Sequence, residues 1–149
     1  MFIILMEVLF MDNKKIAIIC ADFNDEITSV MLETALLRAK QQQLEVIKIV
    51  KVPGCFDMPY VIKKILVHDQ DHKKIDGIIT LGAVLQGDTD HDIIVADHCA
   101  RKCTDLSVEY VIPIALGVIG PRVSWQNALK RREEYAVRAI DAVKMLIQC

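Results

Sequence analysis

Aromatic residues and net charge are both scarce in this chain of 149 residues. Phenylalanine, tyrosine and tryptophan make up 5% of it, and 18 basic residues nearly balance 20 acidic ones. The absence of a basic stripe argues against a nucleic-acid partner, and the absence of an acidic tail argues against disorder. Since 53% of the residues are hydrophobic, we expect an aliphatic core and some apolar surface buried between subunits.

Disulfide spacing of the secreted kind is also missing. The five cysteines are odd in number, so we expect a reducing, cytoplasmic compartment. Cys99 and Cys103 would share one face of a helix, but further metal ligands are lacking, so two buried thiols are the favoured interpretation.

The apolar start of the chain is too short to span a membrane, and no basic residue precedes it as in a signal peptide. We expect residues 1–14 to be an extension that either pairs with a neighbouring subunit or reflects the choice of start site. Residues 15–149 are expected to form one domain without a membrane partner.

Apolar, β-branched runs alternate with amphipathic segments over most of the chain. Strands are expected at residues 15–21, 44–52, 76–85 and 111–118, and helices at 25–43, 58–68, 90–109 and 124–147. Four such units in series predict an α/β three-layer sandwich, in which helices cover both faces of a four-stranded parallel sheet.

Ligands of open parallel sheets bind beyond the carboxyl ends of the strands. The four loops expected there contain most of the polar and aromatic residues that a core would not accept; they span residues 22–24, 53–57, 86–91 and 117–122. We therefore expect a small-molecule site at this end, with His91 at its centre.

Each candidate in the first two loops has a structural and a functional interpretation. Phe23 either covers the core or offers a platform to a planar ring, and neither is favoured. Asn24 suits a helix N-cap better than a ligand contact, although both can hold. Gly54 permits close approach of a ligand or simply makes a turn. Asp57 could hold a polyol or cap the next helix.

The third loop combines a possible anion site with a histidine. Free N–H groups around Asp88 and Thr89 could bind phosphate at the start of a helix, although an ordinary N-cap is the favoured interpretation of that pattern alone. His91 lies beside them, and its imidazole could exchange protons near neutral pH. His98, two turns further on, is interpreted as structural.

Arginines on the last helix could neutralise a bound anion. Arg131 and Arg132 lie on a charged face of the kind that is usually solvated, and Arg122 or Arg138 could fill the same role. The pattern alone does not choose among them.

Taken together, these residues resemble the 6,7-dimethyl-8-ribityllumazine synthase family of riboflavin biosynthesis, in particular its archaeal-type members. The resemblance spans residues 15–145 and rests on the segments ADFN, VPGCFDMP, LGAVLQGDTDHD, DLS and ALKR. It implies a flavodoxin-like fold and no metal or organic cofactor. The implied reaction condenses 5-amino-6-(D-ribitylamino)uracil with 3,4-dihydroxy-2-butanone 4-phosphate. The implied assembly is a homo-oligomer, either a pentamer or an icosahedral shell of pentamers, with sites between neighbouring subunits.

The resemblance also implies a role for each site residue. His91 would shuttle protons, and Phe23 would stack on the pyrimidine. The remaining roles fall into three groups: the ribityl chain held at Gly54, Cys55, Phe56 and Asp57; the pyrimidine pocket lined by Val84 and Leu85; and the phosphate bound by Asp88, Thr89 and Arg131.

Two departures from the family pattern bear on binding. Leu116 stands where many members have an aromatic residue that packs into the neighbour's site, so stacking from that side should be weaker. A lysine common on the last helix has no clear match at Ala136 or Val137, so phosphate binding should depend more on Arg131.

Two alternatives remain, an archaeal-type riboflavin synthase and a non-catalytic shell protein that binds flavin or lumazine. The Phe-Asn pair favours the lumazine synthase over the first. Intact His91 and Arg131 argue against the second.

Overall fold

The computed structural model of the chain describes residues 13–149. The expected pairing of the N-terminal extension concerns residues 1–12, which lie outside the described residues.

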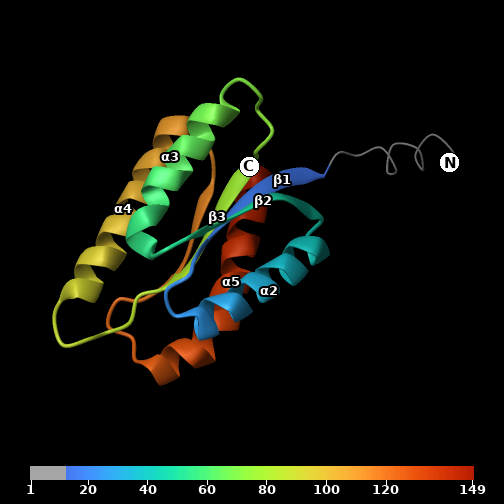
Figure 1. Cartoon of the computed structure of the whole chain (residues 1–149). Helices are drawn as coiled ribbons and strands as arrows, with labels where there is room; N and C mark the ends of the chain where they lie inside the picture. The colour runs from blue at the N-terminus through green and yellow to red at the C-terminus, as the bar shows by residue number, and fades with distance from the viewer. Residues whose placement is uncertain (1–12) are drawn as a thin grey trace, which may run out of the picture.

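Strands and helices alternate along the described residues, as the sequence predicts (Figure 1). The strands are β1 (Lys14–Ala21), β2 (Leu44–Val52), β3 (Gly77–Ala83) and β4 (Ile114–Ile119). The α-helices are α2 (Asp25–Gln41), α3 (Met58–Asp69), α4 (His91–Tyr110) and α5 (Trp125–Ile147), and a 3-10 helix, η1 (Cys55–Asp57), precedes α3. None of these helices has the length and apolar character that crossing a membrane requires.

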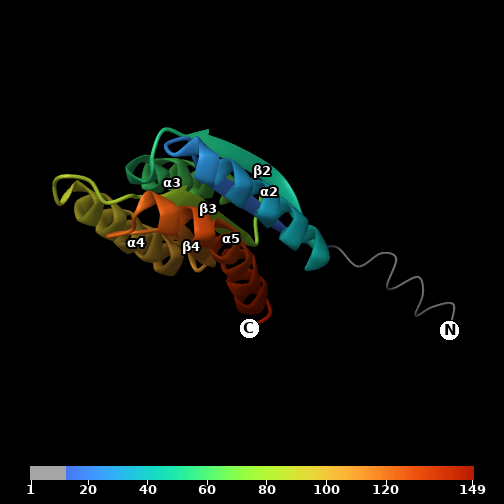
Figure 2. The ribbon, with the colours of Figure 1, turned by 90° about the horizontal axis from the view of Figure 1, so that it is seen from below.

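The sheet is entirely parallel, with the strand order β2-β1-β3-β4. Helices α2 and α5 cover one face, and α3 and α4 cover the other (Figures 1 and 2). Every residue of β3 is buried, because helices exclude water from both of its faces. The expected three-layer α/β sandwich is confirmed, and it is consistent with a flavodoxin-like fold.

Some element boundaries differ from those that the sequence predicts. The fourth strand begins at Ile114 instead of residue 111, because Val111 has φ 52° and ends α4 in a left-handed conformation. The third strand ends at Ala83 instead of residue 85. Val84 and Leu85 therefore belong to the loop at the carboxyl end of the sheet.

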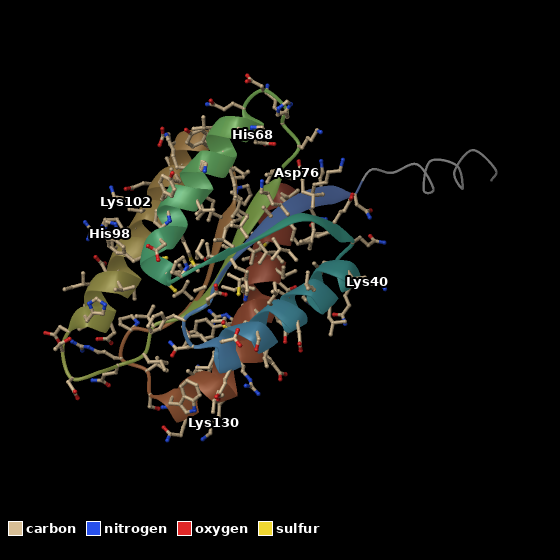
Figure 3. The ribbon with its side chains drawn as sticks, in the orientation of Figure 1. Lys40, His68, Asp76, His98, Lys102 and Lys130 are labelled. Atoms are coloured by element: carbon tan, nitrogen blue, oxygen red, sulfur yellow. The ribbon has the colours of Figure 1, made fainter. Side chains whose placement is uncertain are left out.

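The amino ends of the strands meet on the opposite side from these loops. Asp76, labelled in Figure 3, accepts a hydrogen bond from the Lys15 N–H at 2.8 Å and fixes the starts of β1 and β3 side by side. The loops that follow β1, β2 and β3 therefore emerge together at the other edge.

Candidate functional site

A cavity of about 390 Å³ opens at the carboxyl ends of the strands. Three loops and the first turn of α4 contribute to its walls. Nine residues singled out in the sequence line it: Phe23, Asn24, Gly54, Cys55, Phe56, Asp57, Val84, Leu85 and His91.

Four other candidates lie outside this cavity in the single chain. Asp88 and Thr89 are exposed in the loop beyond its rim, and Arg131 is exposed on α5. Lys130, the residue before Arg131, lies near the start of α5, on the face of the sheet opposite His98 and α4 (Figure 3). Leu116 is 48% exposed and lines a separate hollow with Pro121 between β4 and α4.

The first loop presents its aromatic ring to solvent. Phe23 is 73% exposed, so it does not cover the core and is free to act as a platform for a planar ring. Asn24 occupies the N-cap position of α2 with φ 62°, but its side chain makes no cap hydrogen bond. Its Nδ2 donates instead to the Ala83 carbonyl at 2.9 Å and ties this loop to the end of β3. Asn24 is therefore at the expected N-cap position, but its side chain does not cap the helix.

The second loop closes on itself through Asp57. The Asp57 Oδ2 accepts a hydrogen bond from the Gly54 N–H at 3.0 Å, while the Asp57 N–H donates to the Gly54 carbonyl at 3.1 Å. The carboxylate makes no cap hydrogen bond to α3. It therefore stabilises the turn around Gly54.

Two further side chains of this loop differ sharply in environment. Burial raises the pKa of the Cys55 thiol to about 12, so this thiol stays protonated and is a poor nucleophile at neutral pH. Phe56 is 55% exposed, and its ring stacks on His98 with the centroids 5.0 Å apart. That contact agrees with a structural role for His98.

The third loop leaves backbone donors free beside the histidine. His91 is exposed at the first position of α4, and its N–H donates to the Thr89 Oγ1 at 3.3 Å. Asp90 occupies the N-cap position of α4 and makes no side-chain cap hydrogen bond, so the expected N-cap at Asp88 or Thr89 is wrong. Within residues 13–149, the N–H groups of Asp88 and Thr89 have no acceptor.

Asp92 is a cavity residue that the sequence interpretation missed. It is only 4% exposed, and its Oδ2 accepts a hydrogen bond from the Arg122 N–H at 2.8 Å. A signal existed in the sequence, because Asp92 begins the spacing that continues with the buried Ala96, Cys99 and Cys103 of α4. A carboxylate on such an apolar stripe needs a partner or a function. The two cysteines are buried free thiols, as expected.

The cavity therefore combines apolar walls, an exposed aromatic ring, a turn held by a carboxylate and an imidazole at the rim. A planar ring with a polar tail fits such walls. The exposed imidazole of His91 can take and give protons beside it.

Comparison with known proteins is consistent with this geometry. The family model described as 6,7-dimethyl-8-ribityllumazine synthase matches residues 13–149. A relative of that name from Saccharolobus islandicus (strain L.S.2.15 / Lassen #1) is 48% identical over 134 residues, covering 90% of this chain and 84% of the relative. Relatives with the same name from Sulfolobus acidocaldarius and Aeropyrum pernix are 46% and 44% identical. The Sulfolobus alignment covers 92% of this chain and 85% of the relative, and the Aeropyrum alignment covers 90% of each.

Proposed function

The chain belongs to the 6,7-dimethyl-8-ribityllumazine synthase family, and from that membership we propose that the cavity beside His91 is its active site. The reaction condenses 5-amino-6-(D-ribitylamino)uracil with 3,4-dihydroxy-2-butanone 4-phosphate to give 6,7-dimethyl-8-ribityllumazine, with release of phosphate and water. It is a transferase reaction of riboflavin biosynthesis. The family match favours neither the riboflavin synthase nor the non-catalytic alternative.

The pyrimidine substrate enters the cavity with its ring on Phe23. The exposure of that side chain and the loop position of Val84 and Leu85 support this assignment, because they leave an aromatic face and backbone groups open to a planar, polar ring. Asn24 supports the pocket by holding the Phe23 loop against the end of β3.

The ribityl chain lies along the second loop, at residues 54–57. One Asp57 oxygen already holds the Gly54 N–H, which leaves the other oxygen for a substrate hydroxyl. Cys55 and Phe56 supply backbone groups and apolar wall at the same place. A polyol recognised in this way contacts groups that the turn has already fixed, so little entropy is lost on binding.

His91 transfers protons during the condensation. The amine of the pyrimidine adds to the butanone carbonyl, and loss of water gives an imine. A proton shift then expels phosphate, and ring closure releases a second water. The imidazole is exposed at the first position of α4, where it can reach a substrate in the cavity. Holding two substrates in register contributes much of the remaining rate enhancement.

The butanone phosphate binds at Asp88 and Thr89, and Arg131 and Leu116 of a neighbouring subunit complete the site. The unpaired N–H groups of the loop support the first part. The exposure of Arg131 and Leu116 outside their own chain's cavity supports the second. The functional unit is then a cytoplasmic homo-oligomer, a pentamer or an icosahedral assembly of pentamers.

The test is to mix the purified protein with both substrates and record lumazine fluorescence and released phosphate. One phosphate per lumazine is expected. Riboflavin formed from lumazine alone would indicate the riboflavin synthase. Binding of lumazine without turnover of any substrate would indicate a non-catalytic protein.

A further inference from the structure

Two hydrogen bonds, one on each side of the loop of residues 87–91, hold it against the loop between β4 and α5. At its start, the Gln86 N–H donates to the Val123 carbonyl at 2.9 Å. At its end, the Asp92 Oδ2 accepts from the Arg122 N–H at 2.8 Å. Arg122 therefore lies at the base of the loop that the proposed function assigns to the substrate phosphate.

The local geometry of Arg122 leaves its guanidinium free. Its φ is 60°, a left-handed conformation, and the bond to Asp92 uses only the backbone N–H. Within residues 13–149, the guanidinium groups of Arg122 and Arg131 form no hydrogen bond or ion pair. The other arginines are all occupied, by Asp141 (Arg38), Asp97 (Arg101), the Glu26 carbonyl (Arg132) and Glu134 (Arg138).

The carboxylates around the phosphate loop favour a further cation in addition to the Arg131 that we propose from a neighbouring subunit. Asp88, Asp90 and Asp92 bring three carboxylates to one end of α4. A dianionic phosphate bound by the loop N–H groups meets these like charges, which reduces its affinity unless an opposite charge lies close by. Among residues 13–149, Arg122 is the only arginine whose backbone is hydrogen-bonded to this loop or to the first turn of α4.

We propose that Arg122 is a further phosphate-binding residue for the butanone substrate, and that the buried Asp92 is a positioning residue that holds it in place. The proposal rests on the proposed function, since the phosphate is that of the second substrate. A planar guanidinium pairs with a phosphate through two N–H groups, which favours arginine over lysine at this position.

Arg122→Gly tests the first half. Glycine accepts the left-handed backbone, so the loop should keep its shape while the charge is lost. The KM for the butanone phosphate should rise by about tenfold to hundredfold, with the KM for the pyrimidine and kcat little changed. The KM of Arg122→Lys for the butanone phosphate should lie between those of wild type and Arg122→Gly. Arg101→Ala is the matched control, because that surface arginine of α4 pairs only with Asp97.

Asp92 is tested by two variants. Asp92→Asn keeps an acceptor oxygen for the Arg122 N–H and should retain the wild-type KM for the butanone phosphate. Asp92→Ala should raise that KM and should add little in the Arg122→Gly background, because both changes then act on one interaction. Fully additive effects, or an asparagine variant as impaired as the alanine variant, would overturn the positioning role.

Calorimetric titration with inorganic phosphate separates this inference from the proposed function. Weaker phosphate binding by Arg122→Gly than by wild type supports the inference. This result would hold even if the wild-type protein made no lumazine. Absence of lumazine would contradict the proposed function alone. Equal phosphate affinity in the two proteins overturns the inference. An equal rise in KM for both substrates also overturns it, since it would indicate general distortion of the site.

Discussion

Two side chains of the cavity, His91 and Cys55, show how environment decides chemical role. Both residue types can transfer protons, but burial raises the pKa of Cys55 to about 12, so it stays neutral. His91 is exposed at the first position of α4. The proton transfer that we propose is therefore assigned to His91 and not to Cys55.

Arg131→Ala should weaken the binding of the butanone phosphate. A lost charge-assisted contact raises the KM for that substrate by about tenfold to hundredfold, while pyrimidine binding stays normal. Steady-state kinetics with each substrate varied in turn measures both. Arg132→Ala is the comparison, because the Arg132 guanidinium already donates to the Glu26 carbonyl. An unchanged KM in Arg131→Ala would move the role to Arg122 or Arg138.

The sequence predicts which residues gather at the site better than it predicts the hydrogen-bond partners of their side chains. The motif residues of the first two loops gather around one cavity with Val84, Leu85 and His91, whereas Asp88 and Thr89 lie beyond its rim. The sequence marks Asn24 and Asp57 as candidate helix caps, but both side chains instead make hydrogen bonds that hold the loops in shape. The helical spacing marks Asp92 as a buried position, but it does not identify the partner, the Arg122 N–H, which lies thirty residues away.

Tight packing between elements holds the second loop in place. A Cβ added at Gly82 in β3 would lie 2.3 Å from the Cys55 Sγ and 3.3 Å from the Met58 Cε. The glycine thus lets η1 and the start of α3 sit directly on the end of the strand. The shape of the ribityl site depends on that close contact.

Gly82→Ala should therefore affect both stability and binding. Overpacking of this kind typically lowers the free energy of unfolding by about 1–3 kcal/mol. Displacement of η1 should also raise the KM for the pyrimidine. Urea denaturation checks the first effect, with Gly87→Ala as control, since a Cβ there meets nothing within 4 Å. Equal stability of the two variants would contradict this account of the packing.

The elements themselves followed from hydrophobic periodicity and the breaks at Pro53-Gly54 and Gly120-Pro121. The boundary of β4 did not, because Val111 and Ile112 continue an apolar run that the sequence does not divide. In the structure, the Ser107 hydroxyl donates to the Ile112 carbonyl at 2.6 Å and fixes a turn there before the strand begins.

In a single chain, several residues expected in the site are exposed to solvent. Phe23, beyond the end of β1, and Leu116, on the outer strand β4, are exposed apolar side chains. Burying such surface against another subunit is favourable and would bring a neighbour's residues to the cavity.

Sedimentation at micromolar concentration should accordingly give a pentamer or larger. Co-expressing His91→Ala with Arg131→Ala should restore wild-type kinetics to about a quarter of the sites by random mixing, because the proposed site takes the two residues from different subunits. Co-expressing His91→Ala with Phe23→Ala should restore none, since both residues line one chain's cavity. A fully active monomer would contradict the shared site.

The turnover of His91→Ala shows whether this cavity performs the condensation through its histidine. Loss of a general acid–base group typically costs about a hundredfold or more in rate. We therefore predict a kcat reduced at least that far, with the affinity for the pyrimidine measured by calorimetry close to that of wild type. Near-normal turnover in His91→Ala would show that the histidine is structural and would contradict the mechanism.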